Sequence, residues 1–280
     1  MRRLTLVLAV AGVALALSGC GATSDGDVVA SVDDIELDRD TFEQLVNDRE
    51  AASGNPVDSQ PDADAARTDG QTARDVAGQF ITLELVRKDL EEMGEPVPEV
   101  DSSLTGAEKF DAEYQAVGTA WVNQGGEVLG SPALQNWYAQ GPTESGIACV
   151  QHILVGDTSE AQAVLERLDA GEAFADVAAE TSLDTQSAVE GGVLGCRPMS
   201  NFSATFIPEF VDASLAAEVG VPTEPVESEF GQHVIRVIPF EELGGDDLIL
   251  ARLIALGQWH DVETDPEIGT WEWINVTQLG

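Results

Sequence analysis

Two apolar runs, each with a single histidine, most constrain the fold of this chain. The first, "VQHILV", carries His152 and is largely apolar on both faces of an extended chain, as expected of a central strand covered on both sides. The second, "GQHVIRVI" at 231–238, places His233 on one face with two β-branched residues. A sheet that contains both runs would bury two histidines in its core.

Helix and turn signals fill the interval between these runs. Ser159 and Gln162 form a capping box ahead of an apolar helix, and a shorter helix follows around Phe174. A glycine turn, "EGGVLG", leads to a third apolar helix or turn, "FIPEFVDASLAA". The order β-α-α-β-α-β, with an antiparallel closing strand, predicts an α+β unit of roughly one hundred residues over 144–242.

The residues before this unit read as a strand, a turn and helices. "VVASVDDIELDRDTFEQLV" predicts a strand, then a helix whose start is marked by Asp40 with Glu43 three residues later. Residues 51–72 have almost no large apolar side chain, so we expect a loop.

Helical periodicity returns at 73–94 and 106–124, and a shorter helix, "SPALQNWYAQ", has proline near its first turn. The aromatic residues of these helices favour core packing over a peptide groove. Residues 245–280 predict a helix followed by strands; Trp259, Trp271 and Trp273 would be exposed if this segment were a free tail.

Charge excludes one class of partner. The chain has 13 Lys and Arg against 51 Asp and Glu, a formal net charge of −38. No basic patch is present to neutralise phosphates, so nucleic acid is not expected as a partner. The acidic residues are spread along the chain, which is typical of a solvated surface.

The first twenty residues have the pattern of an export signal. Arg2 and Arg3 precede an apolar stretch from Leu4 to Leu17, which is short for a bilayer span, and small residues then lead to Cys20. "LSGC" resembles the lipobox of bacterial lipoproteins, and the resemblance implies that Cys20 is lipidated and attaches the protein to a membrane. An ordinary signal peptide or a membrane anchor is the alternative.

The remaining cysteines and histidines predict a pair of cysteines and disfavour a metal site, and a missing motif disfavours a hydrolase. Cys149 and Cys196 would be an even pair outside the cytoplasm, so they form either a disulfide or two buried thiols. The three histidines and these cysteines have no close ligand spacing, which disfavours zinc. No G-x-S-x-G elbow is present, which disfavours a serine hydrolase.

Seven fragments in register resemble the parvulin family of peptidyl-prolyl isomerases: "HILV", "GEAF", "ETSLD", "GGVLG", "PEF", "PVESEFGQHVI" and the helix between the first two. The resemblance covers about 145–240 and implies the fold of that family, an antiparallel sheet with flanking helices. The segment ahead of it resembles the entry of SurA- and PrsA-type secreted foldases. "DPEIGTWEW" is similar to the tail of actinobacterial relatives.

This resemblance assigns the candidate site. His152 and His233 match the two histidines at the floor of the parvulin site, and Asp184 in "TSLD" matches the aspartate or cysteine near the imide carbonyl. Leu194, Phe206 and Phe210 match the apolar pocket for the proline ring.

Two residues depart from the pattern of the family: Val193 replaces an aspartate in "GGVLG", and Gln232 replaces a common aromatic. A change at either position could weaken activity.

The resemblance further implies four segments: a lipoprotein signal at 1–20, a helical SurA/PrsA-like module at 21–143, the isomerase at 144–242, and a segment at 243–280 that returns to the first module. The expected function is an extracytoplasmic, lipid-anchored isomerase and foldase acting on X–Pro bonds of secreted or envelope proteins. No cofactor or metal is expected, because isomerisation breaks no covalent bond. The alternative is a holdase chaperone whose parvulin unit is inactive.

Overall fold

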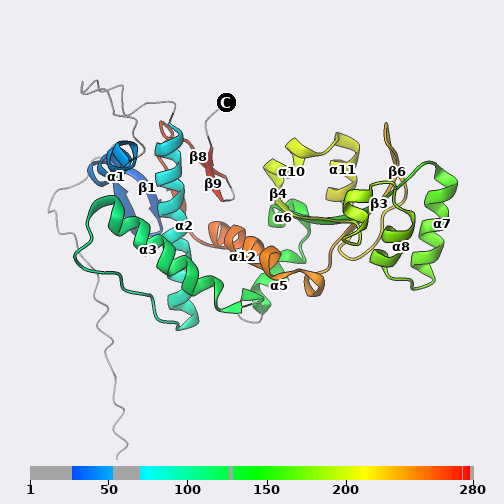
Figure 1. The fold of residues 1–280 in the computed structure, drawn as a ribbon, viewed down its shortest axis with the longest axis horizontal. Coiled ribbons are helices and arrows are strands. Elements are labelled where there is room, and N and C mark those ends of the chain that lie inside the picture. Colours follow the sequence, from blue (N-terminus) through cyan, green and yellow to red (C-terminus); the bar gives the residue numbers. More distant parts are fainter. Residues whose placement is uncertain (1–26, 53–69, 126–128, 273, 278–280) are drawn as a thin grey trace, which may run out of the picture.

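The computed structural model of the chain describes residues 27–52, 70–125, 129–272 and 274–277. The predicted export signal with Cys20 and most of the predicted loop at 51–72 lie outside the described residues. Two bodies are formed: the first combines the early and late described segments, and the second is made by the segment between them (Figure 1).

The first body joins elements from both sides of the sequence. These are β1 (Val28–Val32), β2 (Ile35–Asp38), α1 (Arg39–Ala52), α2 (Gln71–Met93), α3 (Gly106–Val122), α12 (Gly245–Trp259), β7 (Val262–Thr264), β8 (Thr270–Glu272) and β9 (Asn275–Thr277). Strand β7 pairs antiparallel with β1, and the small sheet has the order β2-β1-β7. The residues after α12 therefore fold onto the helices that precede the second body.

Apolar periodicity explains the helices of this body. The predicted face of α2, with Val76, Phe80 and Leu83, is buried, and so are Val117 and Trp121 of α3. These side chains form one core cluster with β1 and β9. The aromatic residues of α3 thus contribute to the core, as their spacing predicts.

Two helix starts differ from the predictions. The cap of α1 is Asp38, which accepts a hydrogen bond from the Thr41 amide at 2.9 Å, so the predicted start at Asp40 was wrong. The cap of α7 (Thr158–Asp169) is Asp157, which accepts a hydrogen bond from the Glu160 amide at 2.9 Å, and not the predicted Ser159. More than one Asp, Ser or Thr residue lies next to each start and can serve as a cap, and the preceding strand decides which one is in place.

The second body is built on a four-stranded antiparallel sheet of order β4-β3-β6-β5. Its strands are β3 (Ile147–Val155), β4 (Val193–Pro198), β5 (Val226–Ser228) and β6 (Gly231–Val237). The predicted central position of the first apolar run is confirmed, because β3 has neighbours on both sides. The short edge strand β5 was not predicted.

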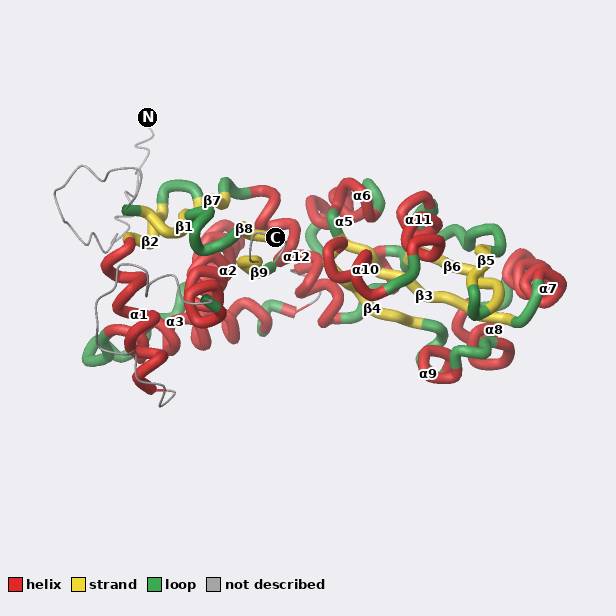
Figure 2. The backbone as a smooth tube through the Cα atoms, turned by 90° about the horizontal axis from the view of Figure 1, so that it is seen from above, coloured by secondary structure: helices red, strands yellow, loops and turns green. Residues whose placement is uncertain are grey.

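Helices cover both faces of this sheet (Figure 2). They are α7 (Thr158–Asp169), α8 (Phe174–Thr181), α9 (Thr185–Ala188), α10 (Met199–Thr205) and α11 (Pro208–Ala216). Ala148 and Val150 pack against α10 and α11, whereas Ile153 and Val155 pack against α7 and α8. The predicted α+β class is confirmed, with α9 as an additional helix between the first two strands.

Helix α12 links the two bodies. It shares a buried cluster with α5 (Pro132–Tyr138) and with Ile147 and Cys149 of β3. Arg252 of α12 forms a buried ion pair with Asp89 of α2, and Asp89 also accepts from Trp121 Nε1 at 2.6 Å. In the part of the chain that the structure describes, no helix is long and apolar enough to cross a membrane.

Candidate active site

The two central strands bring His152 and His233 together. In the register of β3 and β6, His233 pairs with Leu154, so the two histidines are diagonal neighbours on one face. Their rings are stacked at a centroid distance of 5.4 Å, and their Nδ1 atoms are 3.2 Å apart. Both residues are more than nine-tenths buried, which leaves their polar atoms dependent on protein partners.

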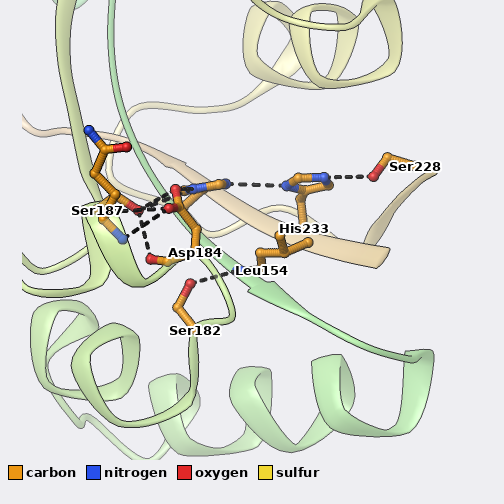
Figure 3. Close-up of polar contacts among 8 residues, drawn as sticks. Leu154, Ser182, Asp184, Ser187, Ser228 and His233 are labelled. Atoms are coloured by element: carbon orange, nitrogen blue, oxygen red, sulfur yellow. Dashed lines mark hydrogen bonds and ion pairs between the residues drawn. The ribbon is translucent and has the colours of Figure 1, made fainter. Parts of the chain in front are cut away.

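Asp184 lies at the other end of the His152 ring. Its Oδ2 is 2.9 Å from Nε2 of His152 and accepts a hydrogen bond from the Ser187 hydroxyl at 2.7 Å (Figure 3). Burial raises the pKa of Asp184, but the hydrogen bonds from His152 and Ser187 outweigh it and lower that pKa to about 2. Asp184 is therefore ionised at neutral pH.

A short backbone link holds the Asp184 segment against β3. The Ser182 hydroxyl accepts from the Leu154 amide at 3.1 Å, and the Leu183 amide donates to the Leu154 carbonyl at 2.7 Å. Asp184 also caps α9, accepting from the Ser187 amide. Its carboxylate is thus fixed by the backbone on both sides.

Ser228 of β5 completes the arrangement on the His233 side. Its hydroxyl is 2.8 Å from Nε2 of His233 (Figure 3). The same hydroxyl accepts a hydrogen bond from the Phe230 amide at 3.0 Å. Burial and the neighbouring His152 lower the pKa of His233 to about 4, although Asp184 acts in the opposite direction. His233 is therefore neutral at pH 7.

These protonation states assign the tautomers. An ionised Asp184 only accepts, so Nε2 of His152 carries a proton and donates to it. In a neutral His152 ring, Nδ1 then accepts from Nδ1–H of His233, and Nε2 of His233 accepts from the Ser228 hydroxyl. The result is a directional chain from Ser228 to Asp184 in which every ring nitrogen is satisfied.

An aromatic cluster lies beside the histidine pair. The Phe210 ring meets His152 and His233 edge-on, at centroid distances of 5.5 and 5.4 Å. Phe206 stacks on Phe210 at 5.1 Å, and Leu194 packs against the same cluster. The structure thus brings together all six residues predicted from the sequence as catalytic or proline-binding.

A glycine allows β4 to approach this site. Gly192 has a φ of 82°, and its carbonyl accepts from the His152 amide at 2.8 Å. A Cβ atom at this position would lie 2.4 Å from the His152 carbonyl oxygen. Only glycine therefore permits this contact, which fixes the backbone of His152.

The cysteines and the two atypical residues lie away from the histidine face. Cys149 and Cys196 are directly paired across β3 and β4 and form a disulfide. Val193 packs with Cys149 and Cys196 in the cluster that contains α12, whereas its neighbour Leu194 packs on the histidine face. Gln232 precedes His233 on β6, so its side chain points to the opposite face.

Sequence reasoning missed the two serines of the site. Ser187 follows Asp184 by three residues, a spacing that places its hydroxyl back at the carboxylate in a helical turn. Ser228 lies on the unpredicted strand β5, five residues before His233. The first could have been found from "D-x-x-S", whereas the second required the pairing of β5 with β6.

The second body is similar in sequence to known proteins. The sequence model of the rotamase family, described as the PPIC-type PPIase domain, matches residues 157–239, which include Asp184 and His233. A foldase protein PrsA of Clostridium botulinum (strain Okra) is 44% identical over 88 residues, covering 31% of this chain and 26% of that protein. The chain thus spans about a quarter of the length of that relative.

A longer match is to a foldase protein PrsA of Oceanobacillus iheyensis, 27% identical over 276 residues, covering 95% of this chain and 82% of that protein. Among solved structures, the parvulin NmPin of Nitrosopumilus maritimus is 38% identical, with a TM-score of 0.30, over 33% of this chain and 96% of that one.

Proposed function

We propose, from the match of residues 157–239 to the PPIC-type PPIase domain, that the protein is a peptidyl-prolyl cis–trans isomerase that assists protein folding outside the cytoplasm. Its substrates are unfolded secreted or envelope proteins with X–Pro bonds. The observation that carries the proposal is the Ser228–His233–His152–Asp184 chain beside an aromatic pocket.

Rotation about an X–Pro bond requires no covalent catalysis from the site. Amide resonance sets a barrier of about 18–20 kcal/mol to rotation about the X–Pro bond, and no covalent bond breaks. Phe206, Phe210 and Leu194 hold the proline ring in an apolar cup, while water is kept from the imide carbonyl. Because a twisted imide is less polar than a planar one, loss of hydration favours the transition state.

The histidine pair orients this site and does not act as a nucleophile. Ionised Asp184 fixes the tautomer of His152, which in turn fixes that of His233. The floor of the pocket is therefore rigid, and the carbonyl and proline ring meet a preorganised surface.

The competing proposal is a holdase with an inactive isomerase unit, based on Val193 and Gln232. Their side chains lie on the sheet face opposite the histidines, so neither contacts the aromatic pocket. This placement favours an active enzyme.

The test is the cis-to-trans relaxation of a proline tetrapeptide in the presence of the purified whole chain. An acceleration proportional to enzyme concentration supports the proposal. If the chain does not accelerate relaxation but still suppresses aggregation of an unfolded client protein, the isomerase proposal is wrong and the holdase proposal replaces it.

Attachment to a membrane through lipid on Cys20 is the second part of the proposal, and it is supported by the apolar stretch and "LSGC" of the sequence. Expression of Cys20→Ala in a bacterial host should move the protein from the membrane fraction to the soluble fraction or the medium. An unchanged distribution would exclude the lipid anchor and leave the isomerase proposal intact.

A further inference from the structure

Arg197 of β4 differs from the other two arginines of the second body. Arg167 and Arg236 each form ion pairs with glutamates. Within the described residues Arg197 makes no ion pair: its Nη1 donates to Asn201 Oδ1 at 3.2 Å, and its Nε is buried without a hydrogen-bond partner. In so acidic a protein, an arginine without a carboxylate partner leaves both a charge and a donor unused.

The position of Arg197 relates this unused group to the active site. Arg197 pairs with Ala148 of β3, which packs on the same face as Phe210. The Arg197 guanidinium carbon is 5.9 Å from the centroid of the Phe206 ring, and Phe206 stacks on Phe210. Arg197 therefore borders the aromatic pocket on the side away from the histidines.

A guanidinium group binds a carboxylate through two parallel hydrogen bonds, and its two terminal nitrogens, Nη1 and Nη2, form one such pair of donors. We propose that Arg197 selects the substrate by binding the carboxylate of an acidic residue directly next to the proline. The preferred substrate class is then Glu–Pro, Asp–Pro or their Pro–Glu and Pro–Asp counterparts. This inference rests on the proposed isomerase activity and assigns Arg197 as a specificity-determining residue.

The negative charge of the second body opposes the proposed preference for an acidic peptide. The second body has three arginines and no lysine among many acidic residues, so its general field disfavours an acidic peptide. A preference for glutamate over lysine can therefore arise only from a local contact. The field alone would produce the reverse order.

The experiment measures kcat/KM of the whole chain on peptides with uncharged ends that differ only beside the proline: Glu, Gln, Lys or Ala before it, and Glu or Gln after it. The assay follows cis-to-trans relaxation without a protease, because a coupling protease has its own charge preference. The proteins are the wild type, Arg197→Gln, Arg197→Lys and the control Arg167→Gln. Arg167→Gln removes the same charge from α7, away from the pocket.

We expect glutamate on one side of the proline to exceed glutamine by about tenfold in the wild type, as a charge-assisted hydrogen bond in a half-exposed site allows. In Arg197→Gln, kcat/KM on the glutamate peptide should be equal to or below that on the glutamine peptide. Arg167→Gln should keep the wild-type preference for glutamate, and Arg197→Lys should retain part of it. The preference is the ratio of the glutamate rate to the glutamine rate within one variant, so a general change in turnover does not alter it. Arg167→Gln should keep the wild-type rate on the alanine peptide within about twofold.

Three results would overturn the inference while leaving the isomerase intact: equal rates on glutamate and glutamine peptides, a preference for lysine, or a glutamate preference that survives Arg197→Gln. Absence of turnover on every peptide would instead contradict the isomerase proposal itself.

Discussion

At the scale of the residue, the site depends on one directional set of hydrogen bonds. His152 is the centre of this set, because it contacts Asp184 on one side and His233 on the other. Removing either ring leaves a buried polar atom without its partner and lets the floor of the pocket move. The six predicted site residues were found because a family resemblance fixes positions along the chain. The pattern contained no information on Ser228, whose partner depends on strand pairing.

The first prediction concerns the histidine pair. His152→Ala and His233→Ala should each lower kcat/KM on a proline tetrapeptide by about tenfold or more, since each loses an oriented hydrogen bond worth roughly 1–1.5 kcal/mol and part of the pocket floor. The control is His260→Ala, which removes the histidine of the first body that lies 2.9 Å from Asp33. Variants that are folded by circular dichroism and retain full kcat/KM would exclude a role for the pair.

The second prediction concerns pH. The pKa of His233 is about 4 in the folded protein, below the value of about 6.5 for an exposed histidine. Between these values the unfolded chain binds more protons than the folded one, so stability decreases as the pH falls from 6.5 to 4. The loss from this residue is at most about 3 kcal/mol, and it should be absent from His233→Asn.

This second prediction is checked by NMR titration of the imidazole signals and by thermal unfolding of both proteins from pH 7 to 4.5. Because His233 stays largely neutral down to pH 5, its protonation should not change kcat/KM between pH 7.5 and 5. A His233 titration near pH 6.5, or parallel stability curves for the two proteins, would contradict the assignment.

At the scale of the element, the sequence predicted whether each long segment is a helix or a strand better than it predicted where that helix or strand begins. The predicted helix at 73–94 is α2, and the central strand is β3, because apolar periodicity is strong over these lengths. The caps of α1 and α7 were misplaced by two residues, since more than one Asp, Ser or Thr residue lies next to each helix start and local sequence does not rank them. Strand β5 has three residues and no periodicity of its own, and only its pairing with β6 makes it a strand.

The third prediction belongs to the β3–β4 pair. The disulfide closes a segment of 47 residues that contains α7, α8 and α9. Reduction, or the double change Cys149→Ala with Cys196→Ala, should lower the free energy of unfolding by about 2–4 kcal/mol. Urea unfolding with and without reductant measures this loss, and the alanine variant should be insensitive to reductant.

Because the disulfide lies on the sheet face opposite the histidines, kcat/KM at 25 °C should remain within about twofold in the folded alanine variant. A large loss of activity without a loss of structure would mean that the disulfide positions His152 as well as stabilising the sheet.

At the scale of the whole molecule, helix α12 holds two bodies together through a few buried contacts. The Asp89–Arg252 pair joins residues 163 positions apart and is enclosed by Trp121 and Ser131. Hydropathy predicted α12 as a helix, but it could not indicate that a charged residue in its middle would be buried, because Arg252 finds its partner only after the chain has folded back.

The fourth prediction tests the buried ion pair between Asp89 and Arg252. Asp89→Asn should destabilise the first body by about 3–5 kcal/mol, because the Arg252 charge is left buried without its partner. Replacement of both residues by methionine should restore much of that loss. Tryptophan fluorescence during urea unfolding measures the effect, since Trp121, Trp137 and Trp259 lie around the link. Equal stability of Asp89→Asn and wild type would show that the pair is solvated.

The pairing of β1 with β7 has a consequence for the order in which the chain can fold as it is made. All strands of the second body lie between residues 147 and 237, so its sheet can close before the rest of the chain emerges. At 5–20 residues per second, β1 waits roughly 10–50 seconds for β7. During that time the helices of the first body present an uncovered apolar surface, and the second body is complete before the first.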